Sequence, residues 1–171
     1  RLKDCGAHAF DELSYPGDSI KQEYKEDILV GYRWHDTKKI PALFPFGHGL
    51  SYTTFTYGKP VASAKTMAAD GTLTVTVAVK NTGSIAGKEI VQLYVGDDKC
   101  SVLRPVKELK HFAKVALAPG EEKSVTFTLT PDDLKFYDEA SAAWKYEPGK
   151  FKAYVCASSA DVRGVVSFEM Q

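Results

Sequence analysis

The clearest pattern along the chain is an alternation of hydrophobic and polar residues in its second half. In residues 72–80, a leucine and three valines occupy every second position, and threonine fills most of the positions between them. Successive side chains of a β-strand point to opposite faces, so this pattern predicts a strand with one buried face. The tripeptide Asn81-Thr82-Gly83 then predicts a turn, because Asn and Gly accept the positive φ that turns require.

The same criterion predicts further short strands, and Pro-Gly pairs at 119–120 and 148–149 mark two of the turns between them. The predicted strands cover residues 55–63, 72–80, 90–95, 106–117, 124–129, 150–156 and 165–169. About seven strands without helical periodicity predict a mainly β fold of the immunoglobulin-like sandwich type. The cysteine pair that joins the sheets of antibody domains is not apparent, so we expect core packing to hold the sheets together.

The first third of the chain is aromatic-rich and irregular. A short strand is predicted over residues 27–33, where Ile, Leu and Val follow one another. Residues 41–52 contain two prolines and two glycines, which exclude a regular helix. Their apolar side chains nevertheless require a packing surface, and we do not expect residues 1–57 to supply it alone. We therefore divide the chain into an irregular part, 1–57, and a sandwich, 58–171.

Composition and charge exclude several classes of partner. The chain has 171 residues, 44% hydrophobic and 26% charged, and a formal net charge of zero. This composition fits a folded protein and shows no basic face for nucleic acid or anionic lipid. No apolar run approaches the roughly 20 residues of a membrane-spanning helix. The chain begins at Arg1 without a methionine or signal peptide, so we expect a processed protein or a piece of a longer one.

The residues that usually carry metal or nucleophilic chemistry are scattered. Cys5, Cys100 and Cys156 form no zinc-ligand spacing, and we interpret them as thiols, with one disulfide as the alternative. The four histidines are equally dispersed, so no metal site is predicted. Ser51 follows His48 but lacks the G-x-S-x-G pattern, and we expect both residues to make local hydrogen bonds in a Gly-rich turn.

Two carboxyl groups that lie close together can act as a catalytic acid and base, so the paired acidic residues are candidates for such a dyad. Most of these pairs stand beside Gly, Pro or Lys and are expected to be solvated. Only Glu26-Asp27, before the predicted strand, is kept as a candidate. The pairs are Asp11-Glu12, Glu26-Asp27, Asp97-Asp98, Glu121-Glu122 and Asp132-Asp133.

Two groups of motifs carry a resemblance to a known family. The sequences ILVGYR at 28–33 and LFPFGHGLSYTTF at 43–55 resemble the end of the second catalytic domain of glycoside hydrolase family 3. The downstream sequences GKEIVQLYV at 87–95 and RPVKELK at 104–110 resemble the fibronectin type III-like domain that closes many of those enzymes. The match covers nearly the whole chain in the expected order.

The resemblance implies a C-terminal part of a retaining exo-β-glycosidase that acts on β-linked glucosyl or xylosyl oligosaccharides. The catalytic aspartate and glutamate of the family would lie upstream of Arg1, so this chain is expected to be inactive alone and to brace the remaining catalytic domains. No cofactor is implied, and export to the periplasm or exterior is expected. Self-association is expected through an apolar surface formed by Leu43, Phe44 and Phe46.

Within that resemblance, Tyr32, Trp34, His35 and Asp36 have two interpretations. Aromatic rings stack on sugars and a carboxylate binds hydroxyls, so these residues are candidates for a wall of the substrate cleft in the parent enzyme. The alternative is packing between the α/β domain and the sandwich, which large aromatic residues most often serve. Trp144 is assigned to the sandwich core or its edge.

An autonomous carbohydrate-binding or adhesion module is the alternative function, because immunoglobulin-like sandwiches also serve such roles. The feature that distinguishes this alternative is an exposed row of aromatic residues on one sheet face. The predicted polar faces carry mostly Thr, Ser, Lys and Gln, with Tyr94 and Tyr154 as isolated aromatics. This composition weakens the alternative.

Overall fold

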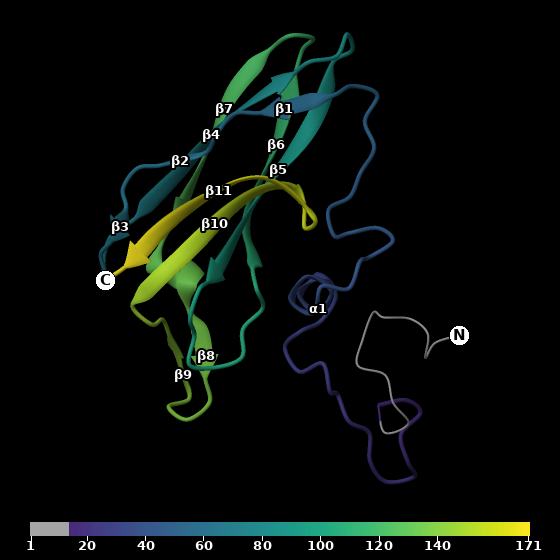
Figure 1. Ribbon diagram of the computed structural model, residues 1–171, viewed down its shortest axis with the longest axis vertical. Coiled ribbons are helices and arrows are strands. Elements are labelled where there is room, and N and C mark those ends of the chain that lie inside the picture. Colours follow the sequence, from purple (N-terminus) through teal and green to yellow (C-terminus); the bar gives the residue numbers. More distant parts are fainter. Residues whose placement is uncertain (1–13) are drawn as a thin grey trace.

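The computed structural model describes residues 14–171, and most of this part folds into a β-sandwich (Figure 1). One sheet contains β1 (Phe55–Tyr57), β2 (Val61–Ala62), β4 (Leu73–Asn81) and β7 (Glu122–Leu129). The other has the order β3 (Thr66–Met67), β11 (Asp161–Met170), β10 (Gly149–Ser158), β5 (Gly87–Asp97) and β6 (Glu108–Leu117). A separate hairpin contains β8 (Phe136–Asp138) and β9 (Ala143–Lys145), and β8 follows a 3₁₀ turn at Pro131–Leu134.

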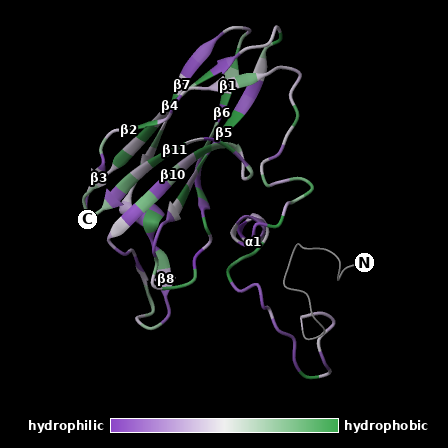
Figure 2. Ribbon diagram, viewed as in Figure 1, coloured by the Kyte–Doolittle hydropathy of each residue, from purple (hydrophilic) through white to green (hydrophobic). Residues whose placement is uncertain are grey.

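The core lies between the two sheets and follows the predicted alternation. Every second residue of β4, from Leu73 to Val79, is at most 1% exposed. These side chains pack in one cluster with Val91 and Leu93 of β5, and the stacked rings of Phe151 and Phe168 extend it at a centroid distance of 5.8 Å. Figure 2 shows the corresponding alternation of hydrophobic and hydrophilic residues along the strands. The predicted mainly β sandwich is therefore confirmed.

The edges of the sheets differ from the predicted strands. The single strand predicted over 55–63 is divided into β1 and β2, with Gly58-Lys59-Pro60 between them. Proline lacks the N–H that a ladder hydrogen bond requires, so continuous pairing with β4 is interrupted there. The short strands β3, β8 and β9 were not predicted, because two or three residues are too few to produce a recognisable period.

The strand predicted over residues 27–33 is wrong. Helix α1 (Tyr32–Lys38) begins in this region, and residues 25–28 form a turn. Gly31, with φ of 62°, turns the chain into the helix, and Lys39 ends it in the left-handed conformation. The apolar run Ile28-Leu29-Val30 is too short to distinguish a strand from other buried backbone, and Leu29 alone among the three is buried.

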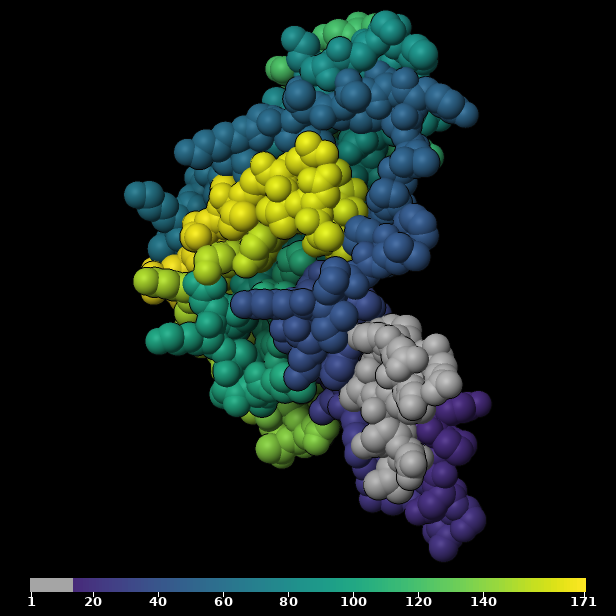
Figure 3. All heavy atoms as spheres, turned by 45° about the vertical axis from the view of Figure 1, so that its right-hand side comes forward, coloured from purple at the N-terminus to yellow at the C-terminus, as the bar shows by residue number. Residues whose placement is uncertain are grey.

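Residues 41–52 form no helix, as predicted, and cross the outer face of the five-stranded sheet. Figure 3 shows α1 and this blue segment lying against the yellow β10–β11 hairpin and the teal β5 region. Residues 55–57 pair with β4, and the division of the chain at 57/58 stays a prediction. In the described residues, no helix combines the length and apolarity needed to cross a membrane. Cys5, His8 and the Asp11-Glu12 pair lie outside the described residues.

Candidate functional site

Helix α1 is fixed to the outer face of the sandwich by polar and aromatic contacts. The Tyr32 hydroxyl accepts a hydrogen bond of 2.9 Å from the backbone N–H of Leu109, and the Thr37 hydroxyl accepts one of 3.0 Å from that of Val106. The Tyr32 ring meets that of Tyr94 edge to face, with centroids 5.6 Å apart. Because these bonds join α1 to β6 and the loop before it, the helix and the sandwich form one body.

A largely buried ion pair contributes to the same attachment. The Lys107 ammonium donates to the Asp36 carboxylate at 2.5 Å, and their side chains are only 9% and 14% exposed. The ammonium also lies 5.5 Å from the centroid of the Tyr94 ring. Removing one member of such a pair leaves an uncompensated charge near the protein interior, so the two residues depend on each other.

Near α1, side-chain hydrogen bonds join β5 to β10, and a separate backbone bond attaches the irregular segment to the residue after β10. The Tyr94 hydroxyl donates to the Gln92 side chain, whose amide donates to the backbone carbonyl of Ala157 at 3.0 Å. Gly47, at φ of 80°, lies so close that an added Cβ would stand 2.2 Å from the Gln92 amide nitrogen. The backbone of Phe46 accepts a hydrogen bond from Ser159. The positive φ and this close approach both favour glycine at position 47.

These contacts also correct the predicted exposure of Tyr94. The alternation along β5 predicts this residue on a polar outer face, yet it is 0% exposed. Helix α1 and Phe46 cover that face, and burial raises the pKa of the Tyr94 hydroxyl above its ordinary value. The sandwich therefore has hydrophobic packing on both faces of β5.

Three of the four candidate sugar-contact residues lie together, beside a groove of about 550 Å³. Tyr32, His35 and Asp36 line this groove with residues 39–42, residues 44–46 and Ser159. Trp34 is not among its lining residues, and the Lys38 ammonium lies 5.2 Å from its ring centroid. The His35 ring bonds to the Ile40 carbonyl at 2.9 Å, at the end of the helix. Tyr32 and Asp36 bond to Leu109 and Lys107 of the sandwich, and these contacts support the packing interpretation.

The irregular segment exposes most of its apolar side chains. Leu43, Leu50 and Tyr52 are 89%, 95% and 96% exposed, and Phe44 is 72% exposed. Phe46 is 51% exposed because one side of its ring contacts Tyr32 at a centroid distance of 5.2 Å. Apolar surface of this extent on a folded protein marks a contact site for another molecule or domain.

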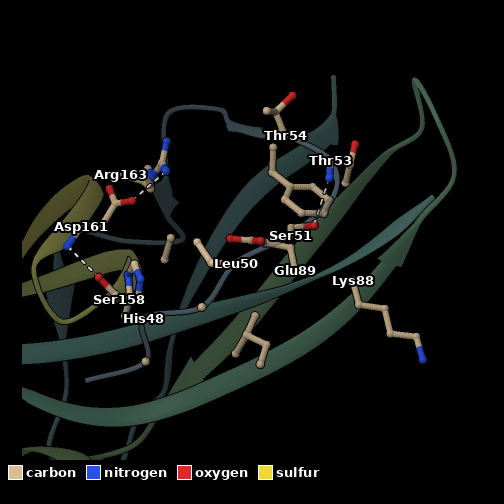
Figure 4. A pocket seen from close by; sticks show the side chains of 15 residues that line it. His48, Leu50, Ser51, Thr53, Thr54, Lys88, Glu89, Ser158, Asp161 and Arg163 are labelled. Carbon is tan, nitrogen blue, oxygen red and sulfur yellow. Dashed lines mark hydrogen bonds and ion pairs between the residues drawn. The ribbon is translucent and has the colours of Figure 1, made fainter. Parts of the chain in front are cut away.

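A second groove, of about 530 Å³, separates residues 47–55 from the edge of the sandwich (Figure 4). Glu89 and Asp161 line it, but each carboxylate already has a partner. Glu89 accepts a bond of 2.7 Å from Tyr57, and Arg163 pairs with Asp161 at 2.7 Å. Burial raises the pKa of Glu89, although the bond from Tyr57 opposes this change. These partners indicate a structural network rather than a hydrolytic dyad.

His48 and Ser51 line the same groove and make the local bonds that the sequence predicts (Figure 4). The Ser51 hydroxyl accepts a bond from the backbone of Thr53, and the backbone of His48 donates to the carbonyl of Pro45. Glu26 and Asp27 occupy a turn before α1, with Asp27 at φ of 54°. No described contact joins any of these residues into a catalytic arrangement.

One group of potential metal ligands occurs among the described residues. Ligand atoms of Asp97, Cys100 and Glu147 lie within 4.8 Å of one another. Glu147 accepts bonds from Ser101, and the Arg104 guanidinium stands 3.6 Å from Asp97. These partners account for the cluster without an ion. Asp97 is only 3% exposed, so its predicted solvation is wrong, and burial raises its pKa.

The two described cysteines are free thiols, as interpreted from the sequence. Cys156 is buried under the outer face, and burial raises its pKa to about 12, so it stays protonated at neutral pH. No sequence feature indicated Lys107, which becomes important only because α1 places Asp36 opposite it. The assignment of Trp144 to the core or its edge is wrong, because this residue is 66% exposed on β9.

The sequence pattern of the fibronectin type III-like domain family matches residues 89–159. This stretch begins in β5 and ends after β10, so the match lies on the sandwich that the structure describes. The class of the folded unit is therefore a fibronectin type III-like domain.

Relatives extend the comparison to the rest of the chain. It is 67% identical over 169 residues to the β-glucosidase BoGH3A of Bacteroides ovatus, and 51% identical over 150 residues to thermostable β-glucosidase B of Acetivibrio thermocellus. Among solved structures, the β-glucosidase DesR of Streptomyces venezuelae, in complex with D-glucose, superposes with a TM-score of 0.87 at 42% identity over 98% of this chain. A family 3 β-glucosidase of Bifidobacterium adolescentis superposes with a TM-score of 0.84 at 38% identity over 92% of the chain.

The chain belongs to glycoside hydrolase family 3, of whose β-glucosidases it represents the C-terminal part with the fibronectin type III-like domain. It spans 23% and 20% of the two curated relatives, and 21% and 23% of the two solved chains. These β-glucosidases are therefore four to five times longer than the region they share with this chain.

Proposed function

We propose that this chain is the structural C-terminal region of a retaining, exo-acting β-glycosidase that removes terminal β-D-glucosyl or β-D-xylosyl residues from oligosaccharides. The relatives are named β-glucosidases, and one of the similar structures contains D-glucose. This support favours the glucoside over the xyloside. The chemistry would belong to two carboxyl groups outside this chain and would require no cofactor.

The bracing role rests on a single observation: one side of the irregular segment is attached to the sandwich and the other side is bare. Gly47 and Phe46 are held against β5 and β10, whereas Leu43, Phe44, Leu50 and the nearby Tyr52 project outward. A surface of this kind suits a permanent contact between domains. The proposed occupant is the catalytic part of the parent protein, and in its absence a second copy of the chain would cover the same surface.

A contribution to the substrate cleft is a subsidiary proposal. His35 lines the groove beside α1, together with Tyr32 and Asp36, and this groove would face the catalytic part across the same contact. Trp34 stands next to them on the helix. Packing between domains is the better supported role for Tyr32 and Asp36, because their polar atoms are already bonded to the sandwich. Export to the periplasm or exterior remains part of the proposal by family resemblance.

A chimera tests the proposed function. This chain would replace the 169 matching residues of the Bacteroides ovatus relative, to which it is 67% identical. The chimera is expected to hydrolyse aryl β-glucosides, and the isolated chain is expected to show no turnover on aryl β-glucosides or β-xylosides. Turnover by the isolated chain that a carboxylate substitution abolishes would contradict the proposal. So would a folded chimera that melts like the relative but lacks activity.

A further inference from the structure

The hairpin β8–β9 carries a pair of exposed aromatic rings that no other part of the described chain covers. Tyr137 and Trp144 are directly opposite each other in the hairpin register. Their rings meet edge to face with centroids 5.7 Å apart, and the residues are 51% and 66% exposed. Figure 1 shows that the hairpin projects from one end of the sandwich. These two rings therefore do not contribute to the sandwich core.

The hairpin is held in a defined conformation. Asp138 accepts hydrogen bonds from the backbone and hydroxyl of Ser141 and from the Lys145 ammonium, which close the turn between the two strands. These bonds lower the pKa of Asp138. At the base of the hairpin, the Arg104 guanidinium lies 5.7 Å from the ring centroid of Phe136. The rings of Tyr137 and Trp144 are thus presented by a fixed turn, which reduces the entropy lost on binding.

Both rings line a groove of about 970 Å³, whose lining also includes residues 102–105 after β5, two residues of β6, and residues 27, 28 and 33 around the start of α1. The charges in this lining are balanced between four cations and four carboxylates. The cations are Arg33, Arg104, Lys110 and Lys135, and the carboxylates are Asp27, Glu108, Asp138 and Glu139. Equal numbers of both signs give no preference for an anionic or cationic ligand. Most of these groups already have a partner: Glu108 pairs with three of the cations, Lys135 with Asp132, and Asp138 with Lys145. A neutral hydroxyl group can therefore bond only to the donors and acceptors that these pairs leave over.

We propose that this groove binds a β-linked gluco-oligosaccharide, with Trp144 and Tyr137 as its stacking surface. A pyranose ring has an apolar C–H face that fits an aromatic ring and a rim of hydroxyls that fits the charged side chains. The volume lies at the upper end of the usual range for ligand pockets, about 300–1,000 Å³, so it accommodates several sugar units. The proposal rests on the proposed function only for the choice of a β-linked glucose chain.

A titration of tryptophan fluorescence reports directly on the groove. The chain contains two tryptophans, so Trp34→Phe leaves Trp144 as the only indole. Addition of cellotetraose or laminaritetraose at millimolar concentration is expected to change the Trp144 emission and to saturate. The α-linked maltotetraose is expected to produce a weaker response.

Variants identify the groove as the source of binding. By calorimetry, Trp144→Ala is expected to weaken cellotetraose binding by at least about tenfold, the loss typical of an aromatic anchor. Tyr137→Ala should weaken it less. Phe112→Ala is the matched control, because Phe112 is an aromatic residue of β6 that is 69% exposed outside the groove lining. Circular dichroism of each variant checks that the sandwich persists.

Two results would overturn the proposal. One is unchanged Trp144 fluorescence with both β-linked tetrasaccharides, which would leave the groove as a contact surface for protein. The other is equal affinity of the parent chain and Trp144→Ala. Because binding is measured on the isolated chain without hydrolysis, an inactive chimera with intact binding would refute only the proposed function, and an active chimera without binding would refute only this inference.

Discussion

Replacing Asp36 with asparagine should detach α1 from the sandwich without unfolding the sheets. The Asp36 carboxylate lies 2.5 Å from the Lys107 ammonium, and both side chains are largely buried. Removing one member of a buried ion pair costs about 3–5 kcal/mol. The lower end, about 3 kcal/mol, applies here because Lys107 regains water when the helix moves away. The substitution therefore reduces the free energy that keeps α1 bound to the sandwich and leaves the stability of the core unchanged.

Amide hydrogen exchange measures this loss locally. The N–H of Leu109 donates to Tyr32 and that of Val106 donates to Thr37, so both amides depend on the docked helix. A loss of about 3 kcal/mol corresponds to exchange faster by a little more than a hundredfold. The amide of Leu93, which lies in the core of the five-stranded sheet, should exchange as in the parent chain.

The matched control is Asp98→Asn. Asp98 pairs with Lys152 at 2.6 Å, but these side chains are 35% and 40% exposed, and such surface pairs contribute at most about 1 kcal/mol. Unchanged exchange at Leu109 in Asp36→Asn would refute the reasoning. A loss of protection that spreads equally to the sheet core would also refute it, because α1 would then be part of the global folding unit.

Three further outcomes are expected. Leu93→Ala should lower the free energy of unfolding in urea by about 2–5 kcal/mol, whereas Leu50→Ala, at a position that is 95% exposed, should leave it unchanged. Burial raises the pKa of Glu89 above 4.5, so the folded state retains this proton and loses stability as pH rises through the folded-state pKa. Glu89→Gln should therefore be more stable than the parent at neutral pH, and the difference in urea midpoint should close below about pH 4.5; a constant difference would exclude this cause. Sedimentation velocity should detect concentration-dependent self-association that Phe44→Asp abolishes, and an unchanged sedimentation coefficient across concentrations would argue against this surface as the contact.

The sandwich was predictable from the sequence because each core strand has its own period. Leu73 and Val75 alternate with threonines, so one face of β4 could be identified without knowledge of its neighbours. The outer face of β5 could not be identified in this way. Tyr94 and Gln92 occupy polar positions in the alternation, yet they are buried by α1 and Gly47, which are distant in sequence.

The attachment of the irregular part was also less predictable, because it depends on contacts between residues that are distant in sequence. The apolar run Ile28-Leu29-Val30 indicated a strand, but a run of this length does not specify its secondary structure, and the helix begins just after it. Trp144 was misplaced because tryptophan is usually buried. Its position opposite Tyr137 depends on a short hairpin that the sequence pattern does not indicate. The contacts that support the packing interpretation of Tyr32 and Asp36, with Leu109 and Lys107, join positions more than 70 residues apart and leave no signal in the sequence.

The central claim is that the exposed segment around Phe44 and Tyr52 faces the catalytic part of a family 3 enzyme. Hydroxyl-radical oxidation read by mass spectrometry tests it, with the isolated chain compared to the chimera made with the Bacteroides ovatus relative. We expect strong oxidation of Phe44 and Tyr52, which are 72% and 96% exposed, in the isolated chain and clear protection in the chimera. Buried Phe151 should be protected in both proteins. Equal oxidation of Phe44 and Tyr52 in a folded, active chimera and in the isolated chain would contradict the account.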